Sequence, residues 1–306
     1  MRLCSSHRVF GAALALAAGA ALPGAAHAQA SGGGWSPFGS ATLVRQGDAD
    51  LEGGGSYGAW STILRAGVLG DLGGGTRAGL VFNYDHADYE FTDPAAFGGV
   101  APWGIVQRYG VAAPLSFTRP DGWSLGLTPS VDWIHENGAD ASESLSWGAI
   151  ASAVRFFPGG DRIGVGLGIF ERPGETRAFP LLIVDWRLSE RWRLANPLPA
   201  GPTGPAGLEL DYRFGGGWNL GLGAAWRSTR LRLSDDGPVP GGVAEEEGVP
   251  VFLRATRSFG PANTLYLYAG IVTSGRLSVE DASGQLQRRV DYRTAPLLGA
   301  TFSARF

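Results

Sequence analysis

The chain has 306 residues, of which 17% are charged and 44% hydrophobic, and it contains 49 glycines, 10 tryptophans and 15 phenylalanines. So aromatic and so weakly charged a composition excludes an intrinsically disordered protein. The formal net charge of −3 argues against a nucleic-acid partner, because nucleic-acid-binding domains usually carry a basic excess. This much glycine would weaken ordinary helices and strands, but it suits a wall of small residues or a close approach of side chains from neighbouring strands.

The first predicted element is a secretory signal peptide, residues 1–28. Val9–Leu22 is an apolar run of about 14 residues, and Ala26-His27-Ala28 is an A-x-A cleavage site. The run is too short to span a bilayer as a helix, which needs about 20 residues. Cleavage after Ala28 leaves a short segment, residues 29–39, before the folded part, although Ala28-Gln29-Ala30 is a second A-x-A site. Cys4, the only cysteine, is removed with the peptide, so we expect no disulfide and no thiolate metal site in the mature chain.

From residue 40 onward, apolar residues alternate with polar or small ones in short runs that turn residues separate, which is typical of strands. Fourteen runs follow one another: 40–48, 57–71, 77–91, 109–117, 123–133, 146–157, 163–171, 177–188, 191–197, 208–214, 218–226, 249–259, 264–279 and 292–306. The run at 40–48 is the weakest and is either a strand or a tether. If two weakly predicted runs are not strands, the number of strands falls from about 14 to about 12. Bacterial barrels permit either even number.

The connections between these runs predict an up-and-down arrangement with unlike ends. Short turns are expected at 72–76, 118–122, 158–161, 189–190, 215–217 and 260–263 on one side. Longer connections are expected at 92–103, 136–144, 199–206, 234–248 and 280–291 on the other side. The short turns and the longer connections fall on opposite sides only if 191–197 is a strand. Short periplasmic turns and longer outer loops are the rule for transmembrane β-barrels.

An internal repeat supports the same arrangement. Gly122–Leu127 and Gly217–Leu222 are nearly the same hexapeptide, and each follows a tight turn. A tryptophan at the start of such a strand belongs in the aromatic girdle at a membrane interface. We therefore assign Trp123 and Trp218 to an interfacial girdle.

The final run ends on an aromatic residue after strict alternation. Counting back from Phe306 in steps of two gives apolar residues, Phe302 among them, while the other register is polar or small. This pattern resembles the terminal signature of Gram-negative outer-membrane β-barrels, which the barrel-assembly machinery binds. The resemblance implies that Phe306 and Phe302 act as an assembly signal, that the protein lies in the outer membrane, and that lipid and lipopolysaccharide surround it.

The expected fold is therefore all-β: a transmembrane antiparallel up-and-down β-barrel of about 12–14 strands over residues 40–306, preceded by the signal peptide. Lipid cannot satisfy the polar edge of an open sheet, so a sheet that spans a membrane has to close on itself. A secreted sandwich, propeller or lectin-like protein would also alternate, but it would explain neither the terminal phenylalanine nor the unequal connections. A narrower likeness covers residues 123–306, chiefly Phe179–Arg187 and Gly204–Tyr212, which look like a family of outer-membrane barrel proteins of unknown function.

Few residues suggest chemistry. His86 and His135 are the histidines that remain after signal removal, and each lies near carboxylates towards the predicted outer end of a strand. Histidine is the natural general base near neutral pH, and two histidines with carboxylates could also bind a transition metal weakly. No nucleophile motif accompanies them, so interfacial or loop histidines are the alternative that we favour. We predict no enzyme activity, no metal and no cofactor.

Charged residues in the lumen register form the main candidate site. The predicted lumen charge cluster consists of Asp185, Arg187, Glu209, Asp211, Arg213, Arg227 and Arg254. Opposed charges in a pore can select solutes, but an ion-pair network can equally fill and brace a narrow barrel. The segment Ser234–Gly248, with Asp235, Asp236 and Glu245–Glu247, is instead expected to be a solvated, mobile outer loop.

These features predict a passive channel or small-solute transport protein of the outer membrane. Two alternatives stay open: a closed structural or surface-binding barrel, and an outer-membrane hydrolase.

Overall fold

A computed structural model describes residues 34–198 and 201–306, so the predicted signal peptide lies outside the described residues. The strands are β1 (Trp35–Asp50), β2 (Ser56–Gly73), β3 (Thr76–Thr92), β4 (Ile105–Ala112), β5 (Leu115–Thr118), β6 (Trp123–Glu136), β7 (Leu145–Phe156), β8 (Arg162–Arg172), β9 (Glu175–Arg187), β10 (Trp192–Ala195), β11 (Ala206–Gly215), β12 (Trp218–Arg232), β13 (Val243–Phe259), β14 (Asn263–Glu280), β15 (Leu286–Tyr292) and β16 (Ala295–Arg305). Two short 3₁₀ helices, η1 (Ala95–Phe97) and η2 (Ala141–Ser144), lie in connections. Within the described ranges, neither is long and apolar enough to cross a membrane.

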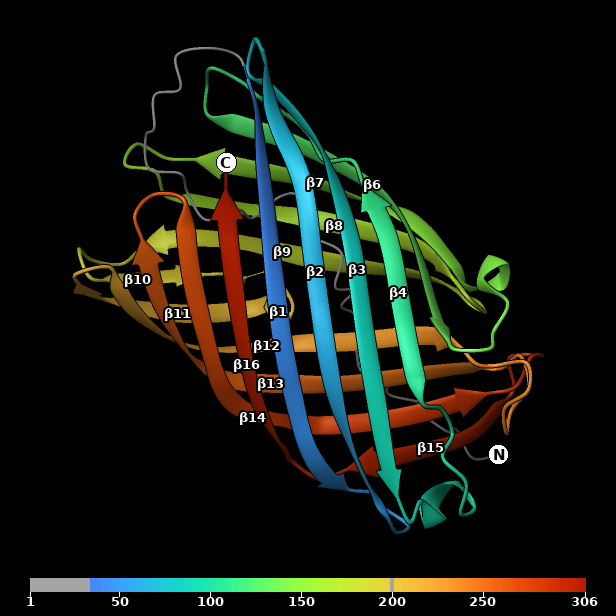
Figure 1. The fold of residues 1–306 in the computed structure, drawn as a ribbon. Helices are drawn as coiled ribbons and strands as arrows, with labels where there is room; N and C mark the ends of the chain where they lie inside the picture. Colours follow the sequence, from blue (N-terminus) through green and yellow to red (C-terminus); the bar gives the residue numbers. More distant parts are fainter. Residues whose placement is uncertain (1–33, 199–200) are drawn as a thin grey trace, which may run out of the picture.

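The strands form one antiparallel sheet that closes on itself (Figure 1). Strands in neighbouring positions of the sheet pair with one another, and β1 pairs with β16 from Phe38 opposite Arg305 to Gln46 opposite Leu297. The hydroxyls of Thr42 and Thr301 are 2.8 Å apart across this pairing of β1 with β16. The weakest predicted strand, residues 40–48, is therefore an integral part of the wall and not a tether.

Two strand positions are each occupied by two short strands. β4 and β5 lie end to end between β3 and β6, separated at Ala113 and Pro114. β15 and β16 pair with successive stretches of β14. The sixteen strands thus occupy fourteen positions, which confirms the upper value predicted from the sequence.

The outer surface of the barrel carries the apolar register of the strands. On β16, Leu298 and Phe302 are 59% and 47% exposed, whereas Leu297 and Thr301 on the opposite face are fully buried. The same alternation on β8 exposes Ile163, Val165, Leu167 and Ile169. An exposed apolar band around a closed sheet is stable in lipid, so the prediction of a transmembrane β-barrel is confirmed.

The two ends of the barrel differ. We call the end with the short connections 74–75, 119–122, 157–161, 188–191, 216–217 and 260–262 the turn end, and the opposite end the loop end. The loop end holds longer connections, but residues 173–174 form a tight turn there too. The loop predicted at 280–291 was too long, because β15 occupies its second half and pairs with β14. The connection at 199–206 was predicted to extend outward, but its described residues 201–205 are buried inside the barrel.

A second correction concerns the predicted mobile loop 234–248. Residues 243–248 form the start of β13, and Glu245 and Glu246 are only 8% and 4% exposed. Three successive glutamates resemble a solvated loop in composition, but arginines from other strands pair with them. Only the remaining part of that segment connects strands.

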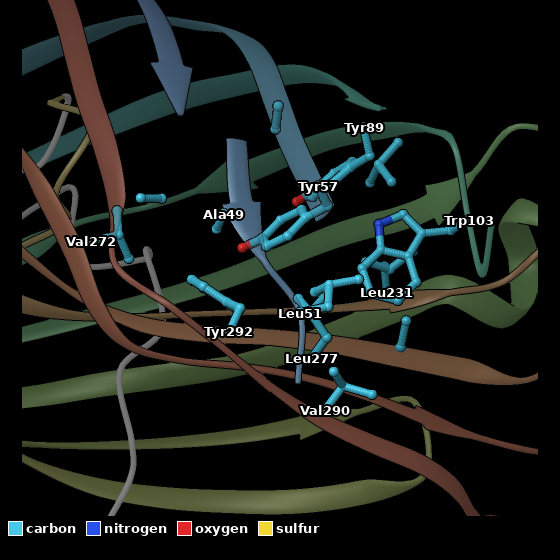
Figure 2. Packing of buried hydrophobic residues seen from close by; sticks show 14 of the residues in the cluster. Ala49, Leu51, Tyr57, Tyr89, Trp103, Leu231, Val272, Leu277, Val290 and Tyr292 are labelled. Carbon is cyan, nitrogen blue, oxygen red and sulfur yellow. The ribbon is translucent and has the colours of Figure 1, made fainter. Parts of the chain in front are cut away.

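The loop end encloses an apolar cluster within the barrel. Figure 2 shows Tyr57, Tyr89, Trp103 and Tyr292 converging with aliphatic side chains from β1, β12, β14 and β15. Trp103 reaches this cluster from the connection between β3 and β4 and is 2% exposed. The interior is therefore packed with side chains at the loop end.

Candidate functional site in the barrel lumen

The lumen wall formed by β2, β3, β4 and β6 carries a row of alternating charges. Asp85 pairs with Arg65 on one side and with Nη1 of Arg108, 3.3 Å away, on the other. Nε of Arg108 donates a hydrogen bond of 2.8 Å to Oδ1 of Asp132, whose side chain is 1% exposed. Buried charges are stable only when they are paired in good geometry, and this row meets that condition across four strands.

A second charged group lies across the lumen, on strands β8 to β13, and we call it the lower cluster. It consists of Arg162, Asp185, Arg193, Glu209, Asp211 and Arg254. Asp185 accepts bonds of 2.5 and 2.6 Å from Arg193 and lies 3.1 Å from Nη2 of Arg162. Nε of Arg254 is 2.7 Å from Glu209, and its Nη2 is 3.7 Å from Asp211.

The structure brings together four residues of the predicted lumen charge cluster: Asp185, Glu209, Asp211 and Arg254. It places the other three elsewhere. Arg187 bonds to the carbonyl of Gly159 at the turn end, and Arg213 is exposed beside the turn at 215–217. These two arginines lie where β9 and β11 reach the turn end. The inner face of the wall is no longer enclosed there, so their position in the strand does not place them in the interior.

Arg227, the third, belongs to a separate network nearer the loop end. Its Nη2 donates to Oε1 of Gln46 at 2.7 Å and to Oε1 of Glu246 at 2.9 Å. The hydroxyls of Tyr57 and Tyr89 also donate to Glu246, at 3.3 and 2.7 Å. This network ties the base of the apolar cluster to β1 and β13.

Glycines provide the room that the carboxylates occupy. A Cβ at Gly221 would lie 1.7 Å from Oε1 of Glu209, and one at Gly110 would lie 2.2 Å from Oδ1 of Asp132. Cβ atoms essentially never come this close to another heavy atom, so a side chain at either position would displace the carboxylate. Part of the high glycine content is thus explained by close approach across strands, as the composition suggested.

Between these charged walls runs a segment that we call the lumen loop, residues 196–205, described except for 199 and 200. Asn196 anchors it: its Nδ2 donates 2.9 Å bonds to the carbonyls of Leu182 and Gly207, and its Oδ1 accepts from the Val184 amide at 2.8 Å. One side chain therefore holds the loop to both β9 and β11.

The lumen loop reaches the far wall of the barrel. A Cβ at Gly201 would lie 2.6 Å from the hydroxyl of Tyr268 on β14, and one at Gly299 on β16 would lie 3.1 Å from Pro202. Thr203, in the middle of the described part, is fully buried. The described part of the loop thus lies against four strands, β9, β11, β14 and β16, inside the barrel.

The lumen loop separates two cavities. An upper cavity of about 120 Å³ lies between Gly201, Pro202 and Gly204 of the loop and the walls of β1–β4, β6, β12 and β13. Its lining combines Arg65, Asp85 and Arg108 of the charge row and Arg227 with aliphatic side chains. A lower cavity of about 50 Å³ is lined by Leu198, Asn196 and the lower cluster. Arg162 also lines a third cavity, of about 160 Å³, towards the turn end.

The two histidines lie in one row across the sheet. His86 on β3 and His135 on β6 both pair with Gln107 on β4, so all three share a face. Nε2 of His135 is 2.7 Å from the hydroxyl of Tyr109, whose ring is 38% exposed on the outer surface. Strand alternation therefore directs the row towards the outer face of the wall, although His135 is only 7% exposed and His86 also borders the upper cavity. In the described part of the chain, no group of three or more potential metal ligands is present.

The predicted girdle residues share one local arrangement. Trp123 and Trp218 are 42% and 45% exposed, each at the turn-end start of its strand. The guanidinium of Arg155 lies 5.8 Å from the ring of Trp123, and that of Arg257 lies 5.2 Å from the ring of Trp218. Each arginine also bonds to a carbonyl of the preceding turn, at Asp121 and Gly216. The hexapeptide repeat therefore corresponds to a repeated cation–π arrangement.

The terminal aromatic residues lie on the outward face. Phe306 is 82% exposed, and its backbone amide donates a 3.0 Å bond to the carbonyl of Pro37. Phe302 is opposite Ala41 where β16 pairs with β1.

Sequence reasoning missed the charge row, two members of the lower cluster and the lumen loop. Arg65, Asp85, Arg108 and Asp132 all occupy the polar register of successive strands, so comparing heights along neighbouring strands could have found them. Arg193 was within the short strand predicted at 191–197. Nothing in the sequence of the lumen loop distinguishes an inward connection from an outward one.

Comparisons with known proteins give fold-level similarities. No protein-family model matches the sequence, and no curated protein matches it, so the narrower likeness found in the sequence stays a prediction. An outer membrane channel from Pseudomonas putida F1 is 12% identical, with 89% of this chain and 95% of that chain covered and a TM-score of 0.47. The P. putida toluene transporter TodX is 9% identical over 88% and 89%, with a TM-score of 0.43. The translocator domain of the autotransporter NalP from Neisseria meningitidis is 12% identical over 91% and 90%, with a TM-score of 0.36. At these scores none of the three assigns a function to this chain.

Proposed function

We propose that the protein is a passive channel of the Gram-negative outer membrane, in which the lumen loop and the lower cluster form the constriction. The observation that supports this proposal is a succession of cavities, each with charged side chains in its lining, on both sides of the lumen loop and towards the turn end. A barrel that only anchored another domain would have no need of charged walls around a central loop.

The walls facing the constriction can select solutes by charge. The lower cluster contains three arginines and three carboxylates, so an ion or polar solute that passes meets both signs at short range. Opposed charged side chains in a narrow pore replace part of the hydration shell and discriminate between ions. We therefore expect weak selectivity that single substitutions shift in a predictable direction.

The test is the reversal potential of the refolded mature chain in a planar bilayer under a salt gradient. Arg193→Gln should shift selectivity towards cations, because Asp185 keeps Arg162 as its partner and the cluster loses one positive charge. Asp211→Asn should shift it towards anions, since Glu209 keeps Arg254.

Arg187→Ala and Arg213→Ala are the matched controls. Both arginines are exposed at the turn end and lie outside the lower cluster, so the reversal potential should stay that of the wild type. Equal shifts in these controls and in the cluster variants would contradict a constriction at the lower cluster.

A closed structural or surface-binding barrel is the second candidate. The observation that favours it is the apolar cluster that packs the loop end. A chain that inserts, shows a heat-modifiable band and never conducts would support this candidate over the channel.

The same proposal orients the barrel and names its surroundings. The turn end would face the periplasm, with Trp123 and Trp218 in the girdle at that interface, and the loop end would face the lipopolysaccharide leaflet. Phe302 and Phe306 would be the residues that the barrel-assembly machinery binds. The outward row of His86 and His135 carries no arrangement that favours hydrolysis, and we propose an interfacial role for it.

A further inference from the structure

One stretch of the barrel wall lacks the strand pairing that closes the rest. β10 pairs with β9 only from Arg193 to Ala195, and Asn196 adds the last bonds at Val184 and Leu182. Across the described part of the chain, residues 175–181 of β9 pair with β8 on one side and with no strand on the other. β9 also has Pro180 here, a residue that cannot donate a ladder bond and is tolerated at a sheet edge.

The facing strand is unpaired over a similar height. β11 begins at Ala206, opposite Trp226, whereas β12 continues to Arg232, where it meets His135 of β6. β10 spans only Trp192–Ala195 and β11 only Ala206–Gly215, so both are shorter than the neighbouring strands β9 and β12. The loop-end half of the wall between β9 and β12 therefore has an interruption, which we call the seam.

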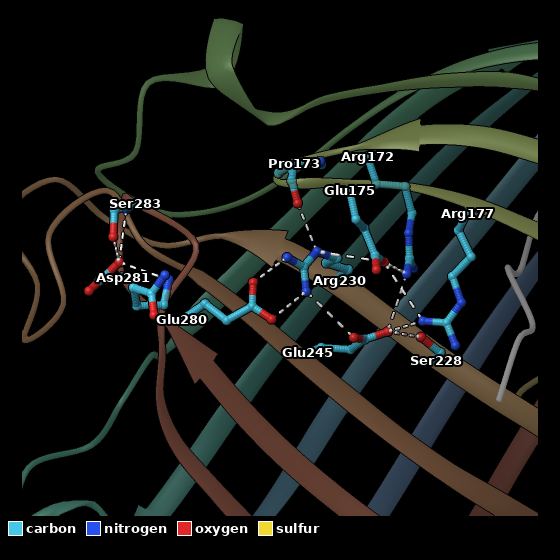
Figure 3. Close-up of polar contacts among 11 residues, drawn as sticks. Arg172, Pro173, Glu175, Arg177, Ser228, Arg230, Glu245, Glu280, Asp281 and Ser283 are labelled. Carbon is cyan, nitrogen blue, oxygen red and sulfur yellow. Dashed lines mark hydrogen bonds and ion pairs between the residues drawn. The ribbon is translucent and has the colours of Figure 1, made fainter. Parts of the chain in front are cut away.

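Side chains and not backbone bonds close this seam. Figure 3 shows the tip of the β8–β9 hairpin held against β12, β13 and β14 by Arg172, Pro173, Glu175, Arg177, Ser228, Arg230, Glu245 and Glu280. Arg230 is central: its Nε donates 2.8 Å to the carbonyl of Pro173, and its other nitrogens pair with Glu245 at 3.5 Å and Glu280 at 2.5 Å.

The hairpin tip contributes further pairs. Nη2 of Arg172 is 3.4 Å from Glu245, and the two terminal nitrogens of Arg177 are 3.3 Å from Glu245 and 3.8 Å from Glu247. The side chains of Arg172 and Arg230 are each 3% exposed, so the seam is shut in this structure. A backbone ladder is continuous, whereas separate ion pairs can break one at a time.

Directly inside the seam lies an apolar patch. Phe179, in the unpaired stretch of β9, stacks on Phe170 of β8 with ring centroids 5.9 Å apart, and both pack on Ile150 and Leu181. These rings face inward, because Phe179 is opposite Gly168, whose outward neighbours Leu167 and Ile169 are 48% and 50% exposed. The lumen surface beside the seam thus suits an aromatic or aliphatic solute, whereas the charged lower cluster does not.

We propose that the seam is a lateral portal, through which apolar or aromatic solutes that dissolve in lipid pass between the lumen and the adjoining leaflet. This inference rests on the proposed channel function and extends it by naming the class of solute. When the Arg–Glu pairs separate, the hairpin tip moves away from β12 and β13, and the Phe170–Phe179 patch becomes continuous with the lipid.

The test locks the seam with a cleavable cross-link. Because Cys4 is the only cysteine and lies in the predicted signal peptide, Arg177→Cys with Glu247→Cys introduces a unique pair across the seam. A bis-methanethiosulfonate reagent joins the pair, and a reductant releases it. Arg172→Cys with Glu245→Cys is a second locking pair, should the first fold poorly.

The readout is uptake by intact Gram-negative cells, whose lipopolysaccharide leaflet slows apolar solutes. N-phenylnaphthylamine is the apolar probe, and nitrocefin cleaved by a periplasmic β-lactamase is the polar one. The cross-link should reduce uptake of the apolar probe to that of cells without the protein, and reduction should restore it. Uptake of the polar probe should be unchanged.

The control pair is Glu171→Cys with Thr176→Cys, which are directly opposed on the paired side of the same hairpin. Cross-linking it should leave both probes unaffected. If polar uptake occurs and apolar uptake is absent or insensitive to the seam lock, the portal is overturned while the channel stands. If neither probe enters faster than in cells without the protein, both proposals fail.

Discussion

Glu209 shows how single residues make a charged interior possible in this barrel. Its carboxylate is 2% exposed and occupies the space that a side chain at Gly221 would take, with Arg254 as its partner at 2.7 Å. Desolvating a carboxylate is costly, and an excellent partner is what offsets that cost. The pair therefore has a large effect on stability when one member is removed.

Replacing Arg254 with methionine should destabilise the barrel by about 3–5 kcal/mol, because it leaves Glu209 buried without a counter-charge. Arg213→Met, at an exposed position of β11, should change stability by no more than about 0.5 kcal/mol. Urea-dependent unfolding in lipid vesicles measures both. Similar small effects for the two variants would show that the Glu209–Arg254 pair is not desolvated.

At the scale of elements, strand alternation alone located every strand position, because one face contacts lipid and the other contacts the interior. Even the short run at 191–197 corresponds to β10, although only Trp192–Ala195 pair. What fills the interior was harder to predict. Glu245–Glu247 and the lumen loop depend on partners far away in sequence, such as Arg230 and Tyr268, and no local pattern records them.

The last strand closes the barrel, and the assembly role proposed for its terminal residue can be tested separately from that structural role. The side chain of Phe306 is 82% exposed, so Phe306→Ser should leave refolding into detergent unchanged. If the terminal aromatic residue is an assembly signal, the same change should reduce the amount of folded protein in the outer membrane of cells. Heat-modifiable bands on gels measure both quantities.

Phe117→Ser is the matched control for that experiment. Phe117 is 44% exposed on β5, also near the turn end, but it lies far from the chain terminus. An equal loss of folded protein in cells for the two variants would attribute the effect to lost lipid contacts and not to recognition of the terminus.

For the whole molecule, the proposed channel depends on the closed sheet, the charged walls and the lumen loop together. The apolar band and the pairing of β1 with β16 make the barrel stable in lipid. Both were predictable, from the alternation of the strands and from the terminal strand. The lumen was predicted only in part, because Asp185, Glu209, Asp211 and Arg254 meet there while Arg187 and Arg213 do not. The register of a strand predicts on which face of the sheet a residue lies. The position of the residue along the strand decides whether that face is enclosed.

If the lumen loop constricts a passive channel, as we propose, its removal should change the single-channel conductance. A variant with residues 197–205 replaced by a short Gly-Ser linker should conduct in larger steps than the wild type, since Gly201 and Pro202 no longer meet β14 and β16. A variant shortened at 282–284, in the exposed connection before β15, should conduct as the wild type does. Equal conductance in all three chains, or none in any, would contradict the claim.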